Sequence, residues 1–251
     1  FLYASIVCFV IEYDGVSDLA SVDKLKLLDV SSLAELSIGR VAFDGSSWEG
    51  ALSFDMGSGN EVTILNHFAS NGKYLVEELV LSDGRVFEMT TGTTGGGAAD
   101  LLVGRSVVDY LKGRGGDDYL VAGANHDVLY GHSGNDTLIG ETGNDTLRGG
   151  DGADRYVVHS GDGDDVIIEY DGIADLISDD VIVFKDIDDI DDLTFSRVAE
   201  SGSSWDGSLL IEAGTDSVRV QHHFASNDLY KIESIELSDG SNHVIDDFIF
   251  L

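Results

Sequence analysis

The chain has no proline and a single cysteine, Cys8, among its 251 residues. One cysteine excludes an internal disulfide and a cysteine-rich zinc site within this chain. The absence of proline, together with 31 glycines, favours turn-rich β structure over helices. The fold therefore has to be stabilised without covalent cross-links.

Positive charge is also scarce, because 14 lysines and arginines face 47 aspartates and glutamates, which leaves a net charge of −33. Such an acidic chain is a poor partner for nucleic acid and for anionic membrane surfaces. It also repels itself unless multivalent cations neutralise it. The hydrophobic content of 43% is nevertheless that of a globular protein, so the acidity does not indicate a disordered tail.

Long apolar runs and catalytic motifs are missing as well. Nothing approaches the length of a membrane-spanning helix, and the apolar start FLYASIVCFVIEYDG lacks the basic segment of a signal peptide. There is no HExxH, GxSxG or GxxxxGK motif.

Acidic pairs such as Asp179 and Asp180 could in principle supply the two carboxylates of a glycosidase, but a solvated acidic face is the better interpretation. His222 and His223 adjoin on an expected strand and would point to opposite faces. We expect no enzymatic activity in this chain.

An aspartate recurs every nine residues through the middle of the chain. Each nonapeptide frame, such as GHSGNDTLI at residues 131–139, has a turn of six residues and a short apolar strand. Two frames make one coil of a flattened right-handed spiral with parallel strands on two faces. Its inward-facing core is expected to be Leu102, Leu111, Leu120, Leu129, Leu138, Leu147 and Tyr156.

Each turn brings a carboxylate and backbone carbonyls close to the turn eighteen residues away. Oxygen ligands of this kind suit a hard cation such as calcium. Without the ion, carboxylates would stack on carboxylates and repel one another. Folding and calcium binding are therefore predicted to be one event.

The frames resemble the G-G-x-G-x-D-x-U-x nonapeptides of the RTX, or haemolysin-type calcium-binding, proteins. The resemblance implies several calcium ions held between turns one coil apart, with three best-supported sites. These pair Asp118 with Asp136, Asp127 with Asp145, and Asp136 with Asp154. The turn residues expected to contribute are Gly113, Gly115, Gly131, Ser133, Gly134, Gly140, Thr142, Gly143, Gly149, Asp151 and Gly152.

The ends of the repeat depart from the pattern. Asp100 and Asp109 are weaker candidate ligands, because GRSVVD places Val107 and Val108 where a glycine and a turn residue belong. At the other end, GDGDD (residues 161–165) is expected to form the last turn, closed by Asp162, Asp164 or Asp165, of which we take Asp165 as the ligand.

A second, longer repeat flanks the nonapeptides with an offset of 156 or 157 residues. GSSWEGAL (45–52) returns as GSSWDGSL (202–209), and HFASN (67–71) returns at 223–227. The copies resemble the haemolysin-type calcium-binding related domain. Their alternating patterns predict short antiparallel strands packed on the end of the roll. Their expected core residues are Trp48, Phe68, Trp205 and Phe224.

These observations predict an all-β chain, a right-handed parallel β-roll flanked by two related antiparallel β modules. The expected domains are a first module (1–92), the roll (93–168) and a second module (169–251). The resemblance implies type I secretion of an unfolded chain that folds in extracellular calcium, in the medium or at a bacterial cell surface. The chain is expected to be part of a larger exported protein of toxin or adhesin type, next to other domains of that protein. Two alternatives stay open: a region that binds polysaccharide or a cell surface, and the accessory part of a secreted lipase, protease or epimerase.

Overall fold

A computed structural model describes the chain over ten ranges. They are residues 9–11, 24–27, 30–41, 51–55, 61–64, 78–90, 93–169, 179–199, 207–224 and 231–245. Within these ranges the chain forms strands and two single-turn 3-10 helices, η1 (Leu33–Glu35) and η2 (Ile190–Asp192). The expected all-β class is confirmed. No helix in the described part of the chain is long and apolar enough to cross a membrane.

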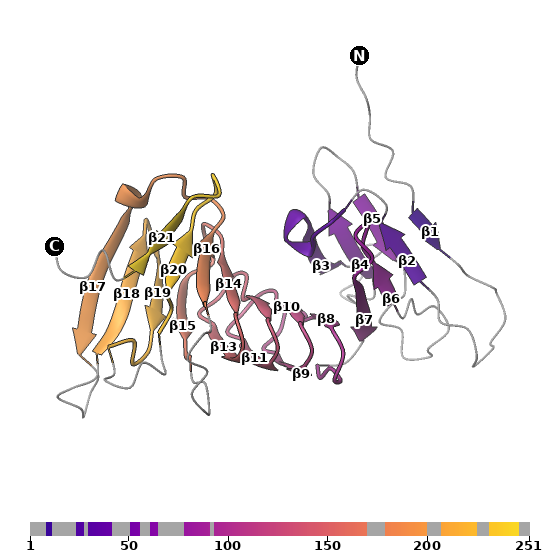
Figure 1. Cartoon of the computed structure of the whole chain (residues 1–251), viewed down its shortest axis with the longest axis horizontal. Helices are drawn as coiled ribbons and strands as arrows, with labels where there is room; N and C mark the ends of the chain where they lie inside the picture. The colour runs from indigo at the N-terminus through magenta and orange to yellow at the C-terminus, as the bar shows by residue number, and fades with distance from the viewer. Residues whose placement is uncertain are drawn as a thin grey trace, which may run out of the picture.

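Two long sheets organise most of these strands (Figure 1). The first sheet has eleven strands, in the spatial order β1 (Phe9–Ile11), β2 (Lys24–Leu27), β6 (Glu78–Val80), β7 (Val86–Thr90), β8 (Asp100–Val103), β10 (Tyr119–Val121), β12 (Thr137–Ile139), β14 (Arg155–Val158), β16 (Val181–Phe184), β20 (Ser234–Glu236) and β21 (Asn242–Val244). The second has seven, in the order β17 (Leu193–Ala199), β18 (Gly207–Ala213), β19 (Asp216–Val220), β15 (Asp164–Ile167), β13 (Thr146–Asp151), β11 (Val128–Ser133) and β9 (Tyr110–Gly115).

The nonapeptide frames place successive strands alternately on these two sheets. Strand β8 lies in the first sheet, β9 in the second and β10 in the first again, and each pairs in parallel with the strand eighteen residues away. Leu120, for example, lies opposite Leu102 and Leu138. The parallel β-roll and its coil of two frames are thus as the sequence predicts.

The core between the two sheets is a stack of single side chains. All seven inward residues named from the sequence are fully buried and belong to one apolar cluster: Leu102, Leu111, Leu120, Leu129, Leu138, Leu147 and Tyr156. Each coil contributes one such side chain per sheet, so the roll has a core one residue thick. Inside the roll, each of these side chains therefore depends on the facing sheet and on the coils above and below it for its burial.

The second flanking module continues the roll edge to edge. Strands β16 and β20 extend the first sheet in parallel beyond β14, and β19 extends the second beyond β15. Antiparallel pairing appears only further out, in β17–β18–β19 and β20–β21. The module therefore shares the roll's hydrogen-bonded sheets, and the expected packing on the end of the roll was too simple a description.

The first flanking module extends the first sheet, because β7 pairs in parallel with β8, and it also covers part of the outer face of that sheet. Its antiparallel strands β3 (Ser37–Val41), β4 (Ala51–Asp55) and β5 (Glu61–Ile64) form a separate sheet. Outward residues of the roll, including Val103, Tyr119 and Val121, share an apolar cluster with Leu33, Ile38 and Leu52 of the module. Two hydrogen bonds cross this contact: the Tyr119 hydroxyl donates to the Leu33 carbonyl at 3.3 Å, and Arg40 Nε donates to the Val103 carbonyl at 2.8 Å.

Some residues named from the sequence lie elsewhere or outside the described ranges. Trp48, Phe68 and Trp205 lie outside them. Phe224 is half-buried against the core of the second module, and the Arg197 guanidinium carbon lies 4.5 Å from the centre of its ring.

The strand expected around His222 and His223 was wrong. Strand β19 ends at Val220, and both histidines lie in the following turn, with His222 at φ 57° and His223 buried.

The one-residue core predicts a strong effect of a single truncation. Leu120→Ala in the calcium-saturated chain should lower the free energy of unfolding by about 2–5 kcal/mol, because neighbouring coils cannot close the cavity. Val108→Ala serves as the control, since Val108 is 53% exposed, and should change stability by less than about 0.5 kcal/mol. Urea denaturation followed by circular dichroism measures both, and equal effects would contradict the description of the core.

Candidate metal centre

The repeat aspartates form a continuous ladder of hydrogen bonds between coils. The backbone N–H of Asp118 donates to Oδ1 of Asp136 at 2.8 Å, and that of Asp127 to Oδ1 of Asp145 at 2.7 Å. Asp100, Asp109 and Asp136 donate in the same way to the aspartate eighteen residues later. The carboxylates thus lie in two columns, one along each edge of the roll. The expected pairing of turns eighteen residues apart is confirmed.

The second carboxylate oxygen of the central rungs has no hydrogen-bond donor. Oδ2 of Asp118, Asp127, Asp136 and Asp145 is buried and accepts no hydrogen bond within the described part of the chain. These side chains are 1–2% exposed. A buried carboxylate oxygen without a donor is costly unless a cation or proton neutralises it. Repeated buried oxygens fit a hard, oxygen-preferring ion such as calcium.

Glycine at the first position of a frame makes room for this oxygen. A Cβ added at Gly113, Gly131, Gly140 or Gly149 would overlap Oδ2 of the aspartate five residues later. The Asp127 frame is the exception, because Ala122 stands at its first position. The first glycine of these frames therefore leaves space for the carboxylate as well as allowing the turn.

At the fourth position of the frame, several glycines have a left-handed backbone. Gly134 and Gly152 both have φ 130°, which side-chain-bearing residues rarely adopt. The N–H of Gly134 donates to the carbonyl of Asp151 at 2.9 Å, and that of Gly116 to the carbonyl of Ser133 at 3.1 Å. Among the turn residues named from the sequence, Ser133 and Asp151 thus use their carbonyls between coils. The Thr142 carbonyl likewise accepts the N–H of Asn125. Gly115 lies next to Gly116 in its turn, and Gly143 lies next to Thr142.

Burial raises the pKa of every central carboxyl above its ordinary value of 3.8. Loss of water is the largest cause, the backbone N–H bond opposes it, and neighbouring carboxylates add to it at Asp118 and Asp145. The pKa rises to about 8 for Asp118 and Asp145, to about 7 for Asp165 and to about 6 for Asp127 and Asp136. At neutral pH and without a cation, the columns are therefore electrostatically unfavourable.

The first rungs of the ladder differ from the central ones. The Asp109 carboxylate is already paired with Arg105, whose guanidinium lies 2.7 Å from Oδ1 and whose N–H donates to Oδ2 at 2.6 Å. Asp100 Oδ2 accepts the N–H of Gly96 at 2.5 Å. These two carboxylates have donors in place of an open oxygen, in line with the poorer frames that surround them.

The ladder continues past the last regular frame. A two-residue slip at Val158 and His159 moves the next frame to 160–168, so that the N–H of Asp145 donates to Oδ1 of Asp165 at 2.9 Å. Of the three acids left open by the sequence, Asp165 takes the position of the ladder aspartate. Asp162 takes the third turn position, where its carbonyl accepts the N–H of Gly143 at 2.7 Å and its Oδ2 accepts that of His159. Asp164 is exposed, and its Oδ1 accepts a hydrogen bond from the Ser217 hydroxyl.

Two buried acids at the end of the ladder, Glu169 and Asp180, and the half-buried Glu233 were not singled out as ligands from the sequence. The N–H of Asp154 donates to Oδ1 of Asp180 at 2.7 Å, and that of Asp180 to Glu233 at 2.9 Å. Oxygens of Asp154, Glu169 and Asp180 lie within 4.8 Å of one another and can hold a metal ion. The solvated face expected for Asp180 was therefore wrong, as it is 1% exposed.

A sequence signal for Asp180 did exist. DVIV at residues 180–183 repeats the aspartate and three-residue apolar strand of frames such as DTLI, without the glycines that precede them. Glu233 stands before β20 in the same way, as ESIE. No comparable signal marks Glu169, which only the folding of the chain brings beside Asp154.

This arrangement defines a class of protein, the calcium-binding β-roll. Comparison with known families agrees: residues 94–129 and 130–167 match the RTX calcium-binding nonapeptide repeat, and residues 209–242 match the haemolysin-type calcium binding protein related domain. The chain thus carries RTX repeats followed by a haemolysin-type related domain. No curated protein matches the chain.

The raised pKa values predict an unusual pH dependence in the absence of calcium. Because the folded carboxyls bind protons more tightly than unfolded ones, the free energy of unfolding in chelator should increase as the pH falls from about 8 to about 5. In saturating calcium the trend should reverse, because protons then compete with the ion. The folded fraction, followed by far-UV circular dichroism in chelator and in calcium at several pH values, tests this, and a folded fraction that rises with pH in chelator would contradict it.

The glycine cradle predicts a position-specific effect of one methyl group. Gly131→Ala should destabilise the calcium-loaded roll by about 1–3 kcal/mol, because the new Cβ would lie 2.8 Å from Asp136 Cγ and 2.7 Å from the Gly149 carbonyl oxygen. Gly97→Ala is the matched control, since nothing lies within 4 Å of its added Cβ. Denaturation of both variants in calcium measures the difference, and equal stabilities would show that the cradle is not needed.

Proposed function

We propose that this chain is a calcium-dependent folding module of a larger secreted protein. Its ligands are Asp118, Asp127, Asp136, Asp145 and Asp154 together with carbonyls of the intervening turns, and Asp165 closes the second column. The observation that supports this most directly is the row of buried Oδ2 atoms at Asp118, Asp127, Asp136 and Asp145, each without a donor within the described ranges. Calcium supplies the positive charge that the fold itself lacks there.

The energetics of the roll favour a folding switch. Its core is one residue thick, and neighbouring rungs within each carboxylate column repel one another when ionised. Extracellular calcium modules typically bind with dissociation constants of about 10⁻⁴ to 10⁻³ M, so such a chain stays unfolded at cytosolic calcium and folds outside the cell. That behaviour suits export of an unfolded chain, and we place the chain in the extracellular space or at a bacterial cell surface.

The parent protein is proposed to be of toxin or adhesin type, with neighbouring domains that carry its activity. The matched families are calcium-binding repeats and their related domain, and we assign no catalytic role to the described residues. An accessory role beside a secreted lipase, protease or epimerase remains the second candidate. A catalytic motif in the rest of the parent sequence would decide between the two.

A calcium titration of the purified chain tests the folding switch. Far-UV circular dichroism should show a cooperative transition from coil to β structure at high-micromolar to millimolar calcium, as expected of extracellular sites. Magnesium at the same concentrations should not produce it, because it demands a tighter octahedral shell and dehydrates reluctantly. A chain that is already folded in chelator at neutral pH would contradict the proposal.

Substitution of two ladder carboxylates should weaken the calcium response specifically. Asp136→Ala together with Asp145→Ala should raise the calcium concentration at the folding midpoint roughly tenfold or more, because one rung is lost from each column. Asp188→Ala is the control, since Asp188 is an exposed acid outside the ladder. The same titration measures both variants, and an equal shift for the control would show that overall charge governs folding.

A further inference from the structure

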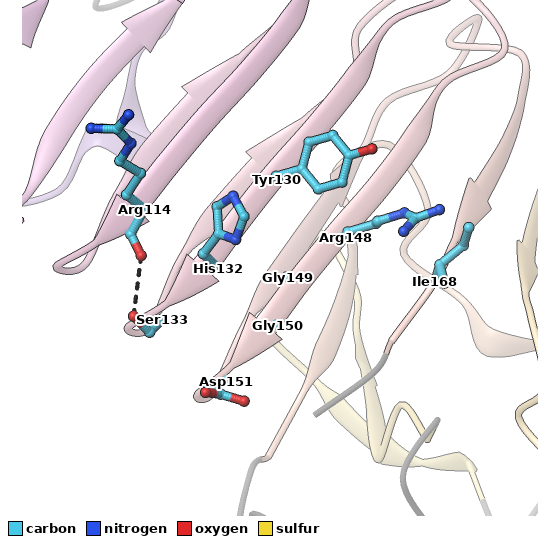
Figure 2. Close-up of a pocket in the computed structure, with 9 residues that line it drawn as sticks. All are labelled: Arg114, Tyr130, His132, Ser133, Arg148, Gly149, Gly150, Asp151 and Ile168. Atoms are coloured by element: carbon cyan, nitrogen blue, oxygen red, sulfur yellow. Dashed lines mark hydrogen bonds between the residues drawn. The ribbon is translucent and has the colours of Figure 1, made fainter. Parts of the chain in front are cut away.

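The outer face of the second sheet carries a groove of about 600 Å³ across β9, β11 and β13 (Figure 2). Arg114 from β9, Tyr130 and His132 from β11, and Arg148 from β13 line it. Lys112 lies beside it, on the other side of Tyr130 from Arg148. At one end the groove meets the turns of the column formed by Asp118, Asp136 and Asp154, because Ser133, Gly149 and Asp151 also line it. The cationic and aromatic side chains of the groove lie on the strands and are not among the calcium ligands named above.

The charge of this face is opposite to that of the chain. Segments 110–114, 128–132 and 146–150, which form most of the three strands, contain no aspartate or glutamate, in a protein with 47 acids. Three of its 14 lysines and arginines lie there. Asp151, at the rim, is the one carboxylate among the nine lining residues (Figure 2). The face is thus a local cationic patch on a strongly acidic molecule.

The cations surround an aromatic ring instead of pairing with acids. Lys112 Nζ lies 5.8 Å and Arg148 Cζ 5.4 Å from the centre of the Tyr130 ring, on neighbouring strands. His132 stacks on the same ring with centroids 5.7 Å apart. Within the described ranges, the side chains of Lys112, Arg114 and Arg148 form no ion pair, whereas Arg85, Arg105 and Arg155 each bind a carboxylate. Uncompensated cations held close together favour an anionic ligand.

The two outer faces of the roll also differ in what covers them. The outer face of the first sheet is apolar and buried against the first flanking module. Lys112, Arg114, His132 and Arg148 on the second sheet are exposed, and Tyr130 is half-buried. Strands β9 and β13 are two strand spacings apart, about 9.5 Å, so Arg114 and Arg148 are placed to meet charges at two points along an extended ligand.

We propose that this groove binds a polysaccharide whose sugars carry carboxylate groups. Guanidinium groups bind carboxylates through paired hydrogen bonds, and the Tyr130 ring offers a flat apolar surface to one face of a pyranose. A nucleic acid would meet the same cations, but its denser charge is repelled more strongly by a chain with a net charge of −33. The inference requires the folded chain and does not depend on calcium being the trigger of folding.

Calorimetric titration with tetragalacturonate in saturating calcium tests the proposal. The chain should bind this probe but not its methyl ester, which keeps the sugar backbone and lacks the charges. Arg114→Gln together with Arg148→Gln should weaken binding roughly tenfold or more. Lys26→Gln together with Lys185→Gln removes two charges elsewhere and should leave binding unchanged. Tyr130→Ala should weaken binding without changing net charge.

Three results would overturn the proposal. Equal binding by the Arg114/Arg148 variant and the chain itself would place the sugar on calcium or at another surface. Tighter binding of a thymidine oligonucleotide of equal charge would identify the groove as a nucleic-acid site. Absence of binding to tetragalacturonate by a chain that circular dichroism shows to be folded would exclude a uronate ligand. Because all arms use folded protein, failure of the calcium switch would leave these outcomes interpretable.

Discussion

In each central coil of the roll, a buried aspartate carboxylate accepts the backbone N–H of the aspartate one coil earlier. This bond sets the register of eighteen residues and brings every carboxylate to within one coil of the next. The same contact that aligns the coils therefore accumulates buried negative charge. The glycine at the first position of most frames and the proposed need for a cation both follow from that stacking.

The columns supply the physical basis for the proposed link between stability and ion binding. One oxygen of each central carboxylate is used by the backbone, and the other faces the space kept open by the first glycine of its frame. In the proposed calcium sites, protons and calcium compete for that second oxygen, and we therefore expect the roll to respond to both pH and the ion. At Asp109, the Arg105 guanidinium already supplies the positive charge that neutralises the carboxylate.

The flanking modules protect the ends and one face of the roll. Strands of the second module pair with the last coil, which removes an exposed parallel edge that would otherwise favour association with other chains. The first module buries the apolar outer face of the first sheet. The remaining outer face needs no such cover, because its outward residues are cationic and aromatic, and it is open to a ligand.

The nonapeptide period by itself determined the β-roll, its inward leucines and the aspartates of the central rungs, because each of these depends only on spacing along the chain. The sequence also indicated that the sites at Asp100 and Asp109 are poorer, through the valines that disturb the frame. Tertiary structure alone decided the remainder. The two-residue slip that places Asp165 opposite Asp145 and the approach of Glu169 to Asp154 both lie past the last regular frame. Such neighbours follow from how strands stack in space, and no local pattern encodes that stacking once the nine-residue register is broken. The grouping of Lys112 and Arg148 around Tyr130, by contrast, follows the regular offset of eighteen residues.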